Sequence, residues 1–181
     1  MKTSVRFNLA ALCACSLCFA QDDSGLKKVH HAQVVVSSAP VSEAEAAATF
    51  ERVRGLFKSI LHVSVPPSHD KVAPDAPITR SEVIAEFVKM YKAAEPKFTL
   101  TPKFIRVDVN RLKIDKPSEK NGLIMMIERG CVGNYGPLAT GSKTSLSVQE
   151  FGDSVGYFMS RIGECTHVPS TKWTPWLHGD N

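Results

Sequence analysis

The chain has 181 residues, which is enough for one ordinary domain or two small modules. Hydrophobic residues make up 43% of the sequence, so a sizeable core can form and a wholly disordered chain is excluded. The formal net charge of +4, together with the absence of a basic stripe interleaved with aromatic residues, argues against nucleic-acid binding.

Residues 1–20 predict a secretory signal peptide. Lys2 and Arg6 form a short positive region, residues 9–20 are apolar, and small residues precede a cleavage site after Ala20. About a dozen apolar residues are too few to cross a bilayer core of roughly 30 Å, and no later segment is apolar enough to do so. We therefore expect an exported protein of the cell envelope, periplasm or cell surface. A buried N-terminal helix and a lipoprotein modified at a cysteine of the apolar stretch are the alternatives.

Cleavage would change both the charge and the cysteine content of the chain. It would remove two basic residues and no acidic ones, which lowers the formal net charge from +4 to +2. Three of the five cysteines would leave with the signal peptide. Cys131 and Cys165 would remain in a compartment that can oxidise thiols. They are a candidate disulfide, with two free thiols as the alternative.

Residues 21–41 are polar around a β-branched run and predict a flexible leader. A first helix begins after Ser42, because Ser42 and Glu45 form a capping box in which each side chain reaches a free backbone N–H. Apolar residues then recur at helical spacing as far as Leu61, and a pair of prolines follows the expected end of the helix.

A second capping box, Thr79 with Glu82, begins the next expected helix. An apolar face follows it at helical spacing, and Pro96 ends the helix because proline cannot continue the backbone hydrogen-bond pattern. Residues 97–117 have no such periodicity, so we expect them to be extended and irregular.

A third helix is expected to begin at Pro117 and to stop at Gly130. A glycine-rich loop, 132–145, separates it from a fourth helix that a further capping box at 147–150 begins. The polar C-terminal tail, 166–181, holds both tryptophans, which we expect to pack back on the core, with stacking on sugar rings as the alternative.

The two halves of the helical region align with each other. Gly55 lies over Gly122 at an offset of 67, and the second helix of each half aligns at an offset of 68 after one inserted loop residue. We therefore predict a mainly α fold in which two helix–loop–helix repeats, 42–96 and 97–165, pack as one small helical domain with irregular loops. A chance register between amphipathic helices with capping boxes is the alternative.

Residues 72–82 and the apolar helix that follows them resemble the S-layer homology (SLH) module. The signature of that family is a Thr-Arg-Ala-Glu-type motif at the start of the second helix, and residues 79–82 read Thr-Arg-Ser-Glu. Residues 104–108 are similar to the Phe-x-Asp-type opening of such a module, with one extra spacer residue. The resemblance covers roughly residues 43–164.

The resemblance implies docking on cell-wall or envelope polysaccharide through the arginine of the motif. Carried to this chain, it makes Arg80 the ligand-binding residue, supported by Thr79 and Glu82. An arginine presents a fork of donors that suits a carboxylate, and a helix N-terminus favours anions. A purely structural capping box is the alternative for these residues. The second unit has Val148 in place of the arginine, and family members often have three modules whereas two are visible in the sequence.

The sequence shows no nucleophile with a base partner, and none of its histidines are paired at helical metal-ligand spacing. We therefore expect no enzyme activity, no cofactor and no metal site. The expected function is that of an exported, non-catalytic SLH-like protein that binds or anchors to cell-envelope polysaccharide. The alternative is a secreted structural or protein-interaction protein with a degenerate SLH-like fold and no sugar binding.

Overall fold

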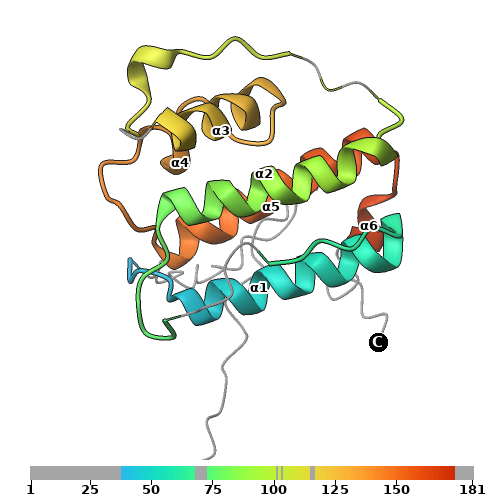
Figure 1. Cartoon of the computed structure of the whole chain (residues 1–181), viewed down its shortest axis with the longest axis horizontal. Helices are drawn as coiled ribbons and strands as arrows, with labels where there is room; N and C mark the ends of the chain where they lie inside the picture. The colour runs from blue at the N-terminus through green and yellow to red at the C-terminus, as the bar shows by residue number, and fades with distance from the viewer. Residues whose placement is uncertain (1–37, 68–72, 101, 103, 115–116, 174–181) are drawn as a thin grey trace, which may run out of the picture. The chain divides into compact units, whose positions relative to one another are not determined.

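The computed structural model describes residues 38–67, 73–100, 102, 104–114 and 117–173. The expected signal peptide, 1–20, nearly all of the expected leader, 21–41, and Trp176 lie outside the described residues. The described part is a small, mainly helical unit without a sheet, which confirms the predicted mainly α class (Figure 1).

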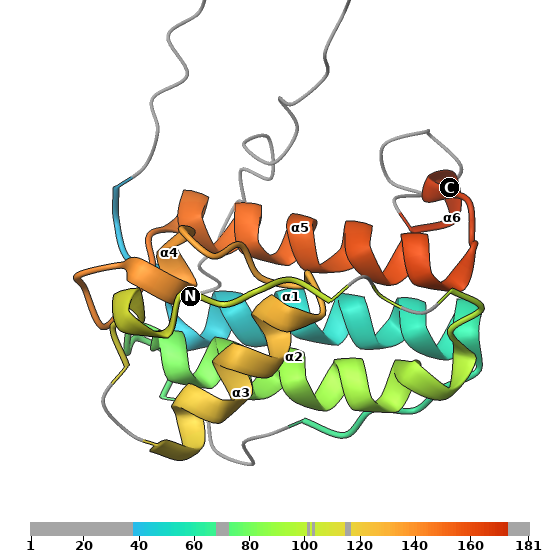
Figure 2. The same cartoon turned by 90° about the horizontal axis from the view of Figure 1, so that it is seen from above.

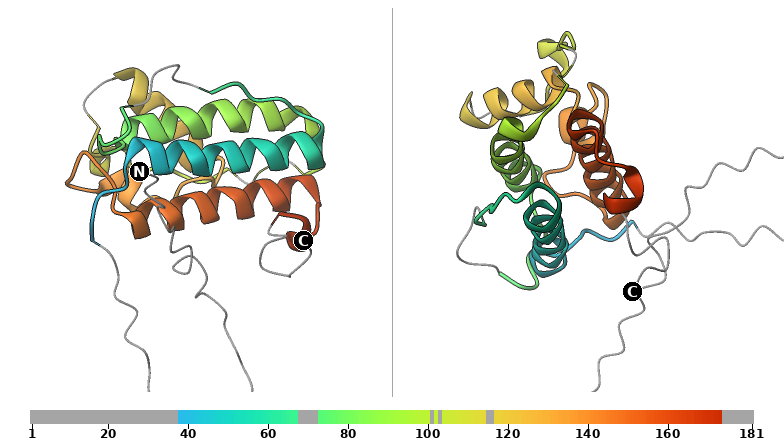
Figure 3. Two further views of the ribbon diagram at one scale, coloured as in Figure 1. Left: turned by 90° about the horizontal axis from the view of Figure 1, so that it is seen from below. Right: turned by 90° about the vertical axis from the view of Figure 1, so that its right-hand side faces the viewer.

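Three long helices lie side by side and form the body of this unit. They are α1 (Glu43–Leu56), α2 (Arg80–Ala94) and α5 (Val148–Thr166). The end-on view in Figure 3 shows them as three neighbouring rods. A π-helical turn, η1 (Phe57–Leu61), continues α1. These three are the helices that the capping boxes predict.

The remaining elements are short and lie around the three long helices. The helix α3 (Pro117–Glu128) packs against α2, on the side away from α1 (Figures 1 and 2). The short helices α4 (Pro137–Thr140) and α6 (Ser170–Trp173) both contact α5. Two 3-10 turns, η2 (Glu95–Lys97) and η3 (Val109–Arg111), interrupt the connection between α2 and α3, whose other described residues are irregular as expected.

The segments that enter α1, α2 and α5 pair with one another in a closed ring. Isolated antiparallel bridges join these pairs of residues: Pro40 and Ser147, Ser42 and Pro77, Thr79 and Ser145. Each segment has a buried apolar residue at its centre: Val41, Ile78 and Leu146. The Val41 amide donates to the Leu146 carbonyl, and the Ile78 amide donates to the Val41 carbonyl, both at 3.0 Å. The three helices therefore begin at the same end of the unit and run in the same direction (Figure 1).

Each of the three helices begins with its predicted capping box. The hydroxyl oxygens of Ser42, Thr79 and Ser147 accept hydrogen bonds from the amide three residues later, and the glutamate at that position accepts from the amide of the capping residue. These contacts satisfy backbone donors that have no partner inside the helix. The glutamates also place negative charge at the positive end of each helix dipole.

Aromatic side chains from the three helices meet in the core. Phe87 of α2 stacks on Phe158 of α5, with ring centroids 4.4 Å apart and ring planes 9° apart. Phe50 of α1 meets Phe87 and Phe151 edge to face, at 6.3 Å and 5.5 Å. All four rings are buried, so the apolar faces predicted from helical spacing are confirmed.

The opposite end of the unit is closed by α6 and by turns in left-handed backbone. Trp173 is buried and meets the Phe57 ring edge to face at 5.8 Å, which confirms that this part of the tail packs on the core. His62 and His167 end η1 and α5 with φ of 55° and 54°, a conformation that costs an L-residue roughly 1–2 kcal/mol. Gly130, the predicted stop of α3, has a φ of 70°, which glycine adopts without that cost.

Candidate functional site

Arg80 lies at the ring of helix starts, as the first residue of α2. The residue is only 6% exposed. Its guanidinium donates to the carbonyl oxygens of Gly141 and, at 2.7 Å, of Lys113, with the Lys143 carbonyl 3.4 Å away. The side chain thereby joins α2 to the segment before α3 and to the loop before α5.

Burial also determines the electrostatics of Arg80. The pKa of Arg80 is lowered, mainly because burial removes the guanidinium from water. The nearby negative charge of Glu150 acts to raise this pKa. An arginine guanidinium nevertheless stays protonated at physiological pH. The ring therefore contains a buried positive charge that carbonyl dipoles and Glu150 offset.

Thr79 and Glu82, the two residues expected to support Arg80, are used in the capping box. The hydroxyl and the amide of Thr79 donate to one carboxylate oxygen of Glu82, at 2.7 Å and 2.8 Å. The structure brings the three predicted site residues together, but their hydrogen bonds lie within the protein. Both terminal nitrogens of Arg80 already donate to carbonyl groups, and this geometry argues against the expected contact between Arg80 and an anionic sugar.

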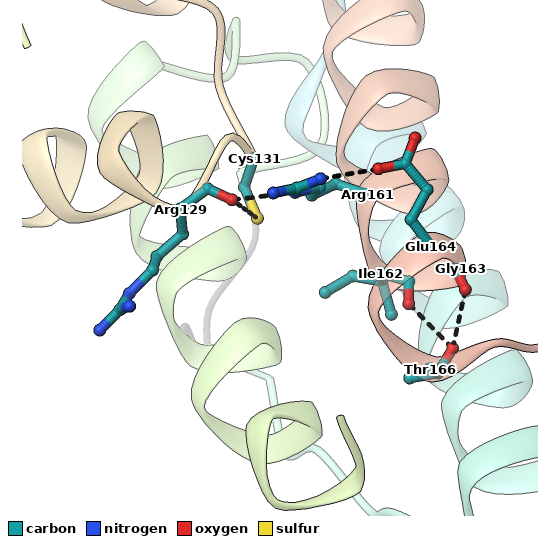
Figure 4. Close-up of polar contacts among 7 residues, drawn as sticks. All are labelled: Arg129, Cys131, Arg161, Ile162, Gly163, Glu164 and Thr166. Atoms are coloured by element: carbon teal, nitrogen blue, oxygen red, sulfur yellow. Dashed lines mark hydrogen bonds and ion pairs between the residues drawn. The ribbon is translucent and has the colours of Figure 1, made fainter. Parts of the chain in front are cut away.

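Cys131 and Cys165, the candidate disulfide, are both buried and are free thiols in this structure. Beside Cys131, the Arg161 side chain extends from α5 and donates to the Arg129 carbonyl at 3.1 Å and to Glu164 at 2.7 Å (Figure 4). The pKa of Cys131 is raised to about 12, mainly because the thiol is buried. Burial also raises the pKa of Cys165. Both thiols are therefore poor nucleophiles at neutral pH, and their oxidation to a disulfide stays a prediction.

A hollow with a volume of about 210 Å³ lies between α5 and the loop that precedes α4. Residues within 131–138, from that loop and the start of α4, form one wall, and Asp153, Ser154 and Tyr157 of α5 form the other. Asp153 and Tyr157 are exposed and lie one helical turn apart, so a carboxylate and a phenol ring border the hollow together. Sequence reasoning missed this pair, because it followed only the apolar stripe of the helix and not its exposed face.

Among the described residues, no group of three or more His, Cys, Asp or Glu side chains is placed to hold a metal ion. The helices in the same part of the chain are too short or too polar to cross a membrane. Comparison of the chain with family models, with curated protein sequences and with solved structures gives no match.

Proposed function

We propose that this chain is an exported, non-catalytic, SLH-like protein that binds or anchors to cell-envelope polysaccharide. The observation that carries the proposal is the ring of three helix starts. In each start a buried apolar residue precedes a hydroxyl cap, and a glutamate follows three residues after the cap: Val41-Ser42-Glu45, Ile78-Thr79-Glu82 and Leu146-Ser147-Glu150. This pattern resembles the way in which the Thr-Arg-Ala-Glu-type motif opens a helix in that family.

The ring favours a division of the chain into three related units. The alignment of the sequence with itself indicates two. The helices α1, α2 and α5 begin alike, run in the same direction and exchange backbone hydrogen bonds at their starts. The helix α3 begins at Pro117, outside this ring. Members of the SLH family often have three modules, so three helix starts fit the resemblance better than the repeats 42–96 and 97–165. We therefore propose that each parallel helix belongs to one reduced unit.

We place the sugar contact at the hollow beside α5 instead of at Arg80. Tyr157 is 50% exposed and offers an aromatic face on which a sugar ring can stack, and the Asp153 carboxylate offers acceptors for sugar hydroxyl groups. The hollow, at about 210 Å³, is smaller than pockets for drug-sized ligands, which measure about 300–1,000 Å³. It suits a single sugar residue of a polymer, and the Asp153 charge favours a neutral or amino sugar over an acidic one.

Retention of the mature chain on an insoluble envelope polysaccharide fraction tests this proposal. We expect Tyr157→Ala to weaken retention about fivefold, which corresponds to the roughly 1 kcal/mol of one aromatic contact. Asp153→Asn should weaken it as well, because the amide replaces one of the two acceptor oxygens. Phe104→Ala is the matched control, since Phe104 is 69% exposed and does not line the hollow.

Two results would count against the proposal in different ways. If Tyr157→Ala and Asp153→Asn were retained as well as the wild type and Phe104→Ala, the hollow would not be the sugar contact. If the wild-type chain itself were not retained, polysaccharide binding would be refuted.

A secreted structural or protein-interaction protein without sugar binding is the second candidate. The burial of Arg80 favours it, because the arginine of the motif donates to Gly141 and Lys113 inside the protein. The matching first position of α5 is Val148, whose side chain has no hydrogen-bond donor for an anion. Enzymatic removal of polysaccharide from the envelope fraction separates the two candidates. Retention that survives this treatment would favour a protein partner.

A further inference from the structure

The connection between α2 and α3 carries most of the large apolar side chains that the described residues expose. Four of the six such side chains belong to it: Leu100 at 46% exposed, Phe104 at 69%, Ile105 at 37% and Val109 at 42%. The other two are tyrosines, which also have a polar group. We call the described residues of this connection between Lys97 and Lys113, namely 97–100, 102 and 104–113, the α2–α3 edge. These four side chains lie within ten residues of one connection, so this connection is the described part of the chain that presents the most apolar surface to a partner.

The same edge holds most of the excess positive charge of the chain. Its described residues include four basic residues and one acidic residue, an excess of three, against a formal net charge of +4 for all 181 residues. Basic and acidic residues are therefore nearly balanced in the rest of the sequence. Arg106, Arg111 and Lys113 are exposed, and the acidic residue, Asp108, forms an ion pair with Arg111 at 3.0 Å. The small net charge of the whole chain therefore conceals a local concentration of positive charge.

Hydrogen bonds hold the edge against α3 and the loop that follows it. The Ile105 amide donates to the Glu128 carbonyl at 2.9 Å, and the Asn134 side chain donates to the Arg106 carbonyl at 3.0 Å. Figure 1 shows the connection passing along the outer side of α3. Phe104, next to these two attachment points, is thus presented to solvent on a held backbone.

We propose that the α2–α3 edge is a docking surface for a membrane that carries anionic lipid. Phe104 and its apolar neighbours enter the boundary between headgroups and acyl chains, and Arg106 and Arg111 lie at the level of the lipid phosphates. A membrane interface offers both an apolar layer and negative charge. An acidic polysaccharide offers charge but no layer that receives aliphatic side chains. The inference does not depend on sugar binding at the hollow.

Co-sedimentation of the mature chain with lipid vesicles tests the proposal. Vesicles of phosphatidylcholine containing one third phosphatidylglycerol are compared with phosphatidylcholine alone, at low and at high salt. We expect binding to the anionic vesicles that salt weakens, because salt screens the surface charge. Phe104→Ala should weaken this binding about tenfold or more, since burial of a phenyl ring contributes about that factor. Arg106→Glu should weaken the preference for anionic vesicles, because it lowers the positive excess of the edge by two charges.

The matched control is Tyr157→Ala, which removes an exposed aromatic side chain from a different surface and should leave vesicle binding unchanged. Thermal unfolding of each variant establishes that it is folded. Equal sedimentation of Phe104→Ala and the wild type, or equal binding to neutral and anionic vesicles, would overturn the proposal. Binding to soluble polyglutamate as tight as that to anionic vesicles would also overturn it, and would assign the edge to an acidic polymer.

Discussion

Replacing Arg80 with alanine separates an internal role of this side chain from a role in ligand binding. The substitution removes the guanidinium but leaves the start of α2 in place. The Arg80 amide still donates to the Thr144 carbonyl at 2.9 Å, and the capping box uses only Thr79 and Glu82. Any change in stability therefore reports the contacts that the side chain makes with the segments before α3 and α5.

The expected loss of unfolding free energy in Arg80→Ala follows from the carbonyl groups that would lose their hydrogen-bond donor. The carbonyl groups of Lys113 and Gly141 each accept a hydrogen bond from the charged guanidinium, and such a bond contributes about 1.5–3 kcal/mol. Removing the arginine also removes the cost of burying its charge. We expect the free energy of unfolding to fall by about 2–4 kcal/mol, which lowers the melting temperature by about 5–15 °C.

Urea unfolding followed by circular dichroism measures this change. Arg52→Ala is the matched control, because Arg52 is an exposed arginine on α1. Its substitution should change the free energy of unfolding by less than about 0.5 kcal/mol. If Arg80→Ala were as stable as Arg52→Ala and also lost retention on polysaccharide, Arg80 would be the sugar contact that the SLH resemblance implies, and the internal role would be refuted.

Two further predictions concern alkaline pH and backbone conformation. Burial raises the pKa of Cys131 from 9.0 to about 12 and that of Tyr91 from 10.0 to about 12. Between these values the unfolded chain loses protons that the folded protein keeps, so the free energy of unfolding is highest below about pH 9 and falls as the pH rises toward 12. A melting temperature of the reduced protein that does not fall across this range would contradict this prediction. Gly130→Ala should lower the free energy of unfolding by about 1–2 kcal/mol, because its φ is 70° and a methyl group there would lie 3.2 Å from Nε of Arg161. Gly55→Ala within α1, where a methyl group meets nothing within 4 Å, should instead raise the free energy of unfolding by about 0.4–1 kcal/mol. If urea unfolding gave the same change for both glycine variants, backbone conformation would not be the cause.

The local features of this fold could be predicted from the sequence because their partners lie within one helical turn. Each capping box needs only a hydroxyl residue and a glutamate three residues later, as at Thr79 and Glu82. The buried faces of the helices follow from apolar residues at helical spacing, and the stop at Gly130 follows from the freedom of glycine in left-handed backbone.

Only the tertiary structure decided which surfaces these elements leave to solvent. The acceptors of the Arg80 guanidinium lie 33, 61 and 63 residues away in the sequence, so the same motif is compatible with a free or a buried arginine until those segments are placed. The ring of helix starts likewise depends on segments far apart in the chain. The exposure of Tyr157 and of Phe104 is set by what packs beside them. Periodicity identifies which side of a helix is apolar, but the packing of distant segments determines which polar groups are used inside the protein and which remain for a partner.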